Sequence, residues 1–282
     1  MNNPDHLRAA GSGPRAGITR AMILAAGLGT RFKPWTDRHP KALAPVNGKS
    51  LLQRNIEYLR QYGIGEVVVN VHHFAGQIIE ALAANKGWGC SYLISDETAG
   101  VLETGGGLKK ARPFLEGSPF VLMNVDILTD MDLEAMIADH FVHRPLATLA
   151  VTDRSTSRYF LFDEKGELCG WRNVSTGQER MARGGEARGS DAVGGVGAVG
   201  EAGTAGGVGG IGGTLIQKAF SGIHVIDPAI FPLMTRDGKF SMVDLYLDLA
   251  AGHPIRAYDH SRSRLIDVGK PESAEQAARL FP

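Results

Sequence analysis

Short apolar runs alternate with amphipathic segments along most of this chain of 282 residues, and this alternation constrains the fold more than any other feature. Several runs are continuous in Val, Ile and Leu, which is typical of strands buried on both faces of a parallel sheet. Because helices join parallel strands through right-handed crossovers, the pattern predicts a single α/β domain with a doubly wound, mostly parallel, Rossmann-like sheet. The expected strands are 21–25, 67–71, 92–95, 120–125, 147–151, 219–226 and 264–268, and the expected helices are 51–62, 74–84, 132–141, 240–251 and 272–281.

A loop rich in small residues follows the first apolar run. It reads Leu24-Ala25-Ala26-Gly27-Leu28-Gly29-Thr30-Arg31, and a second cation, Lys41, comes ten residues later. A tight backbone loop with several free N–H groups and two cations nearby suits the phosphates of a nucleotide. It is not a dinucleotide fingerprint, because Phe32 stands where the third glycine belongs, and it is not a Walker A loop, because Leu43 replaces the first glycine ahead of 48–50.

Two carboxylates follow apolar runs at the carboxyl ends of expected strands. Asp126 comes directly after 120–125, and Asp267 follows Leu265-Ile266. In a doubly wound sheet ligands bind at this edge, and Mg²⁺ takes a few carboxylate oxygens while keeping phosphate and water as its other ligands. The pair therefore predicts a magnesium site over nucleotide phosphates. The alternative is that each aspartate only caps a turn or helix.

Composition excludes some classes of partner. Lys plus Arg and Asp plus Glu both number 30, so charge offers no case for nucleic acid or an anionic membrane. The two cysteines have no metal-binding spacing and are expected to be reduced thiols. Residues 1–17 are expected to form a flexible polar tail without a signal sequence, and no apolar run approaches the ~20 residues of a membrane span, so we expect a cytoplasmic protein.

Residues 184–213 differ from the rest of the chain, since close to half of them are glycine and they show no periodicity. Such a segment buries too little surface to offset the entropy of ordering glycine, and we expect a disordered insertion within the domain at 18–282. A lid over the site is the alternative.

Four motifs in order resemble the signatures of sugar-1-phosphate nucleotidyltransferases, from about residue 18 to the end and apart from the insertion. They are residues 24–31, Pro40-Lys41-Ala42-Leu43-Ala44-Pro45-Val46, Asn124-Val125-Asp126 and Asp267-Val268-Gly269-Lys270-Pro271. Leu102-Glu103-Thr104-Gly105-Gly106-Gly107 is most similar to the triple glycine of N-acetylmuramate-1-phosphate uridylyltransferases, whereas mannose-1-phosphate guanylyltransferases more often carry Gly-Thr-Ala-Gly.

The resemblance implies that a sugar 1-phosphate attacks the α-phosphorus of a nucleoside triphosphate, UTP being favoured, with release of pyrophosphate. It implies roles for Arg31 and Lys41 on the phosphates and for Asp126 and Asp267 as Mg²⁺ ligands. By the same resemblance the nucleotide would lie against Leu24, Ala25, Ala26, Gly27, Gly29, Thr30 and Arg31, its base against Thr104, Gly105 and Gly106, and the sugar against Asn124, Asn173, Ser221 and Gly222.

Some alternatives stay open at this point. Asn124 either binds a sugar hydroxyl or shapes its turn, and 169–173 lacks the Glu-Lys-Pro that many members of the family have there. A mannose-1-phosphate guanylyltransferase is the alternative within the family. A regulatory relative that binds nucleotide sugars without turnover is the alternative of another class, and a homo-oligomer is left open.

Overall fold

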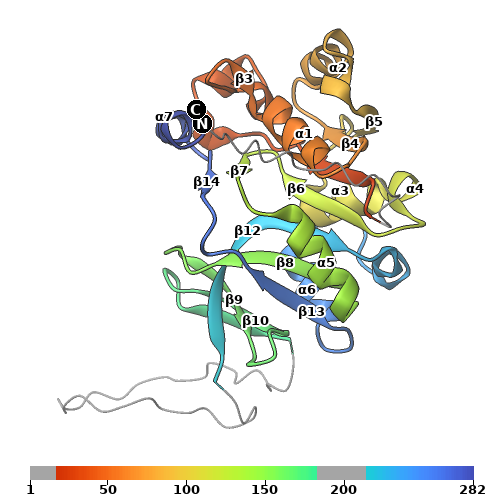
Figure 1. The fold of residues 1–282 in the computed structure, drawn as a ribbon, viewed down its shortest axis with the longest axis vertical. Coiled ribbons are helices and arrows are strands. Elements are labelled where there is room, and N and C mark those ends of the chain that lie inside the picture. The colour runs from red at the N-terminus through yellow and green to blue at the C-terminus, as the bar shows by residue number, and fades with distance from the viewer. Residues whose placement is uncertain (1–16, 183–213) are drawn as a thin grey trace, which may run out of the picture.

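The computed structural model describes residues 17–182 and 214–282 (Figure 1). The predicted insertion at 184–213 and nearly all of the predicted tail lie outside the described residues. Within the described residues no helix is long and apolar enough to cross a membrane.

A ten-stranded sheet forms the centre of the molecule, in the order β11-β10-β9-β12-β6-β1-β4-β5, with β8 also paired to β12 and β13 paired to β8. Strands β6, β1, β4 and β5 run parallel, whereas β12 pairs antiparallel with β6, β8 and β9. Its strands are β1 (Arg20–Leu24), β4 (Glu66–Val71), β5 (Ser91–Asp96), β6 (Phe120–Asn124), β8 (Ala147–Thr152), β9 (Arg158–Phe162), β10 (Leu168–Asn173), β11 (Gln178–Met181), β12 (Ile216–Ile226) and β13 (Ile255–Asp259).

Two short ribbons lie outside this sheet. β2 (Pro45–Val46) pairs with β3 (Lys49–Ser50), and β7 (Ile127–Thr129) pairs antiparallel with β14 (Leu265–Asp267). The second ribbon matters for the site, since it joins the segment after β6 to a segment near the end of the chain.

Helices cover both faces of the sheet and give the domain two apolar layers. Side chains of α1, α2, α5 and α7 pack with one face, and those of α3, α4 and α6 pack with the other. β1 shows the alternation, because Ala21 and Ile23 belong to the first layer and Met22 to the second. The helices are α1 (Leu51–Gln61), α2 (Ala75–Ala84), α3 (Glu103–Lys110), α4 (Arg112–Leu115), α5 (Leu133–His143), α6 (Met242–Leu249) and α7 (Pro271–Leu280).

The doubly wound α/β fold is confirmed, and every predicted strand and helix is present within a few residues. The antiparallel pairing around β12 was not predicted, because strand direction is set by connections rather than by apolar content. The strands β9, β10, β11 and β13 and the helix α3 were also missed. α3 contains three consecutive glycines, which disfavour a helix by propensity, and it forms because it is packed on other elements.

Candidate active site

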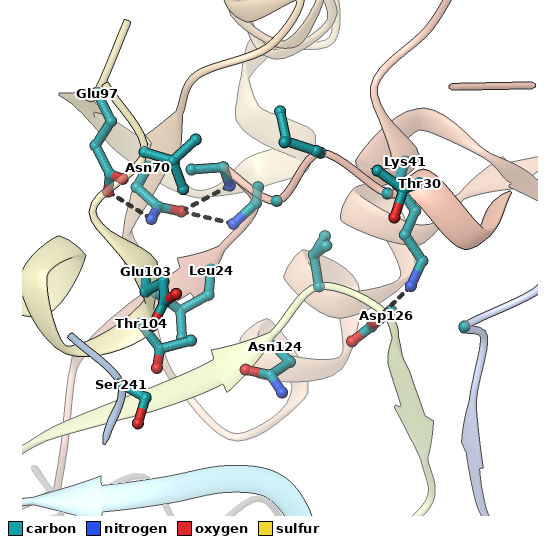
Figure 2. Close-up of a pocket in the computed structure, with 18 of the residues that line it drawn as sticks. Leu24, Thr30, Lys41, Asn70, Glu97, Glu103, Thr104, Asn124, Asp126 and Ser241 are labelled. Atoms are coloured by element: carbon teal, nitrogen blue, oxygen red, sulfur yellow. Dashed lines mark hydrogen bonds and ion pairs between the residues drawn. The ribbon is translucent and has the colours of Figure 1, made fainter. Parts of the chain in front are cut away.

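A cleft of about 540 Å³ opens where the parallel strands end, which is a volume typical of small-ligand sites (Figure 2). Residues 24–31 of the loop after β1 form one wall with Lys41. The polar ends of β4, β5 and β6 form the floor, and the start of α3 together with residues near 240 forms the opposite wall. This is the edge at which doubly wound sheets bind their ligands.

The loop after β1 has the shape that its two glycines allow. Gly29 adopts a left-handed φ of 61°, and a Cβ there would lie 2.9 Å from the Thr36 side chain and 3.0 Å from Lys41 Cβ. Gly29 therefore brings Lys41 against the loop. A Cβ at Gly27, by contrast, would meet no protein atom within 4 Å, so its small size leaves open space in the cleft rather than serving protein packing.

The start of the loop is held by Asn70, which lies near the end of β4 and is 2% exposed. Asn70 Oδ1 accepts from the N–H groups of Ala25, at 2.6 Å, and Ala26, at 3.2 Å. Both alanines line the cleft, but their N–H groups already have a partner in the protein. The prediction that Ala25 and Ala26 lie against a nucleotide stays a prediction, but their N–H groups are bonded to Asn70 and are not free for phosphates. No acceptor is recorded among the described residues for the N–H groups of Gly27 and Gly29.

Lys41 and Asp126 form an ion pair in the cleft (Figure 2). Lys41 Nζ donates to Asp126 Oδ2 at 2.5 Å, and the lysine side chain is only 11% exposed. The turn that carries Asp126 is held by Asn55 of α1, whose amide donates to the Val125 carbonyl at 2.7 Å. The aspartate is thus placed by α1 and β6 together.

Asp267 reaches the same place through the β7–β14 ribbon, which pairs it with Ile127. The Val268 N–H donates to the Asp126 carbonyl at 2.8 Å, so the two aspartates lie on adjoining backbones. Although part of the residue is open to solvent, desolvation and the neighbouring Asp126 carboxylate raise the pKa of Asp267, against the opposing effect of Lys41 and Arg31. The structure therefore brings together all four predicted catalytic side chains. Each of the two cations is separated from each of the two aspartates by 85 to 236 positions in the sequence.

The triple glycine at the start of α3 is explained by close packing. A Cβ at Gly105 would lie 2.5 Å from the Phe240 ring, one at Gly106 would overlap the Gly238 carbonyl, and one at Gly107 would lie 2.7 Å from Glu97 Oε1. The N–H groups of Gly105 and Gly106 both donate to the Phe240 carbonyl, at 2.9 and 3.2 Å.

The resemblance placed Gly105 and Gly106 against the base. Both are buried and absent from the lining of the cleft, and their N–H groups are already bonded to Phe240, so these N–H groups are not available to a base. Thr104 does line the cleft, beside Glu103, and its Oγ1 accepts from the Met242 N–H at 2.9 Å. The glycines thus place these two side chains by letting α3 approach the segment before α6.

The predicted sugar-binding residues divide into two groups. Asn124 lines the cleft, and no hydrogen bond of its side chain is recorded among the described residues (Figure 2). Gly222, with a φ of 73°, lies behind it, since a Cβ there would be 2.8 Å from Asn124 Nδ2. Ser221 is fully buried and its Oγ lies 2.8 Å from His260 Nε2, so this hydroxyl does not face the cleft. Asn173 accepts from the Ser175 N–H in a turn at the end of β10 and is not among the cleft residues.

Several residues of the cleft were missed from the sequence. Asn70, Glu97, Lys239 and Ser241 all line it. A signal for the first two was available, because each is a polar residue at or just beyond the carboxyl end of a predicted parallel strand. Asn70 belongs to β4, which pairs with β1, and Glu97 follows β5, which pairs with β4. Lys239 Nζ lies 3.5 Å from Glu103 Oε1 on the wall formed by the start of α3 and the residues near 240, and no local sequence pattern predicts this pair.

The fold and these motifs define a family. The profile of the Nucleotidyl transferase family matches residues 20–161, half of the chain, and the chain belongs to this family. The match covers the loop after β1, Lys41, α3 and Asp126.

Among known proteins the chain is 45% identical over 116 residues to the N-acetylmuramate alpha-1-phosphate uridylyltransferase of Neisseria meningitidis, which covers 41% of this chain and 50% of that protein. It is 44% identical over 108 residues to the enzyme of the same name from Caulobacter vibrioides, covering 38% of this chain and 45% of that one. The chain spans about half the length of these curated relatives.

Solved structures share the fold over nearly the whole chain. HddC from Yersinia pseudotuberculosis, complexed with GMP-PN, superposes with a TM-score of 0.68 at 21% identity, covering 94% of this chain and all of that one. A UDP-glucose pyrophosphorylase complexed with UDP-glucose gives a TM-score of 0.66 at 17% identity, covering 94% and 98%.

Proposed function

We propose that this protein is an enzyme that transfers a nucleoside monophosphate from a nucleoside triphosphate to a sugar 1-phosphate, releasing pyrophosphate and forming a nucleoside diphosphate sugar. The single observation that carries the proposal is the cleft itself. It brings together the loop after β1, whose Gly27 and Gly29 N–H groups have no recorded acceptor in the described part of the chain, the cation Arg31, and the Lys41–Asp126 pair with Asp267 next to it, at the ligand edge of the sheet.

The reaction needs charge neutralisation and positioning more than proton transfer. A phosphate monoester has a second pKa near ~6, so the attacking oxygen of the sugar 1-phosphate is largely ionised at neutral pH. That oxygen forms a bond to the α-phosphorus while the bond to pyrophosphate breaks, and no general base is required. Lys41 supplies a point charge beside the reacting phosphates, and Arg31 offers a planar fork to the triphosphate and the leaving pyrophosphate.

The pair of carboxylates fits a divalent cation. The two aspartates lie on adjoining backbones, and desolvation together with the Asp126 carboxylate raises the pKa of Asp267. They form an oxygen donor set whose mutual repulsion a cation would relieve. Asp126 and Asp267 would hold Mg²⁺, which when bound supplies positive charge to the phosphates.

UTP and N-acetylmuramate 1-phosphate, or a related hexose 1-phosphate, are the favoured substrates. The support is the 45% and 44% identity to two proteins named N-acetylmuramate alpha-1-phosphate uridylyltransferase, over 41% and 38% of this chain. Mannose-1-phosphate guanylyltransferase activity is the second candidate, supported by 34% identity over 154 residues to such an enzyme of Drosophila melanogaster. Retention of both aspartates and both cations argues against a regulator without turnover. Cytoplasmic location stays a prediction.

The test is pyrophosphate release in the presence of Mg²⁺, with UTP, GTP, CTP, dTTP and ATP each paired with several sugar 1-phosphates. The sugars are N-acetylmuramate, N-acetylglucosamine, glucose and mannose. Turnover with UTP and N-acetylmuramate 1-phosphate is expected, and it should disappear when EDTA removes the metal. Turnover only with GTP and mannose 1-phosphate would keep the mechanism and overturn the substrate. Nucleotide binding without turnover on any pair would favour the regulatory relative.

A further inference from the structure

A buried carboxylate behind the nucleotide loop has no part in the mechanism above. Glu97 follows β5, is 1% exposed, and contacts Asn70 through a hydrogen bond of 2.7 Å from Asn70 Nδ2 to Glu97 Oε1 (Figure 2). Burying a carboxylate is unfavourable unless it is hydrogen-bonded. Burial raises the pKa of Glu97, and the hydrogen bond from Asn70 opposes this. The short hydrogen bond from Asn70 connects this carboxylate to the nucleotide loop.

The oxygen and the NH₂ group of the Asn70 carboxamide have partners of opposite hydrogen-bonding type. On one side the N–H groups of Ala25 and Ala26 can only donate, so the amide oxygen must face them. On the other side an ionised carboxylate can only accept, so the amide NH₂ must face Glu97. A rotation of the carboxamide by 180° would set donors against donors and acceptor against acceptor. Glu97 thus excludes the one alternative rotamer that would release the loop.

Glu97 also connects the two walls of the cleft. Its Oε2 accepts from the Leu102 N–H at 3.4 Å, at the N-cap of α3, and its backbone carbonyl lies 2.7 Å from His72 Nδ1. Gly107 leaves the space for this arrangement, because a Cβ there would lie 2.7 Å from Glu97 Oε1 and 3.0 Å from Asn70 Nδ2. The loop after β1 and the start of α3 are therefore held by one buried pair.

We propose that Glu97 is a positioning residue, which orients the Asn70 carboxamide and thereby holds Ala25 and Ala26 so that the following loop amides face the nucleotide. The inference rests on the proposed function only in taking residues 24–31 as the nucleotide loop. Glu97 acts without touching the reacting atoms. Removing its hydrogen bond should loosen the loop and weaken nucleotide binding.

The test exchanges the hydrogen-bond donor and acceptor between residues 70 and 97. In Asn70→Asp the loop amides keep an acceptor, but two carboxylates face each other across 2.7 Å and repel. In the double variant Asn70→Asp with Glu97→Gln, the glutamine amide donates to the new aspartate. The hydrogen bond between residues 70 and 97 is thus restored with its direction reversed, and the bonds from the loop amides keep their direction. Glu97→Gln alone keeps an acceptor for Asn70 and should lose less than Asn70→Asp. Asn85→Asp is the matched control, because its side chain is exposed and the one hydrogen bond recorded for it among the described residues goes to the Ala81 carbonyl.

Two measurements at pH 8.5 test the proposal. The first is the dissociation constant of UTP with Mg²⁺ by calorimetry. We expect Asn70→Asp to raise it by at least about tenfold, the double variant to return to within about threefold of the natural protein, and Asn85→Asp to change it less than twofold. The second is amide hydrogen exchange of peptides covering 24–29, which should be faster in Asn70→Asp and restored in the double variant.

Equal UTP binding and equal exchange in Asn70→Asp would overturn the inference, as would a double variant as impaired as the single one. The exchange measurement needs no ligand, so it separates this inference from the proposed function. If the natural protein binds no nucleotide while the exchange pattern follows the expected order, the nucleotide role of the loop fails and the positioning of the loop by Glu97 stands.

Discussion

The packing of the triple glycine can be tested with one added methyl group at Gly105. A Cβ there would lie 2.5 Å from two carbons of the buried Phe240 ring and 3.0 Å from the Phe240 carbonyl oxygen. Since carbon atoms in proteins pack at about 3.5–4.0 Å, the ring or the helix must move by about 1 Å. Overpacking of this kind destabilises by about 1–3 kcal/mol, which exceeds the gain of at most about 1 kcal/mol from replacing a helical glycine with alanine.

Gly105→Ala should therefore lower the free energy of unfolding by about 1–2 kcal/mol. For a domain of this size that corresponds to a fall in Tm of roughly 2–6 °C. The assay is thermal and urea unfolding followed by circular dichroism. Gly76→Ala is the matched control, because Gly76 lies in the first turn of α2 with no heavy atom within 4 Å of a built Cβ, and it should be neutral or stabilising by about 0.5 kcal/mol. If Gly105→Ala is as stable as the natural protein, close packing does not explain this glycine.

Three further predictions concern Asp126, Lys41 and the buried His260. Asp126→Asn should abolish pyrophosphate release while leaving the circular dichroism spectrum unchanged, because a charged oxygen is lost and side-chain volume is kept; full activity with Mg²⁺ would remove Asp126 from the metal site. Lys41→Ala should lower kcat by about 10²-fold, since its charge acts where charge develops, whereas a change confined to KM would indicate uniform binding. Burial lowers the pKa of His260 from 6.5 to about 4, so the unfolded chain binds more protons between these values and stability should rise with pH across this window. The free energy of unfolding should change by about 3 kcal/mol across this window because of His260. His260→Gln should reduce the slope of unfolding free energy against pH between 4 and 6.5, because up to one fewer proton is taken up on unfolding; an unchanged slope would contradict the assignment.

Much of the site could be predicted because its residues follow local rules. Asp126 ends an apolar strand, and Arg31 follows a small-residue loop, so strand position and residue type were enough to place both at one edge. Ser221 shows where this fails. It lies next to Gly222 in a strand beside the cleft, yet its hydroxyl contacts His260, 39 residues later in the chain. The alternation of side chains along a regular strand does not predict which side chains face the ligand where the strand is irregular. β12 is irregular here, because its register with β8 shifts between Phe220 and His224.

The sequence by itself determined the α/β class, the succession along the chain of most strands and helices, and four charged residues of the site, Arg31, Lys41, Asp126 and Asp267. It could do so because hydrophobic periodicity and chain connection are local properties, and because parallel strands bring their carboxyl ends to one edge. Only the tertiary structure decided what the glycines at 105–107 are for and which group holds Asn70. A glycine indicates that something lies close without saying what, and a buried hydrogen bond between Asn70 and Glu97 depends on the registration of β4, β5 and α3, which no short stretch of sequence contains.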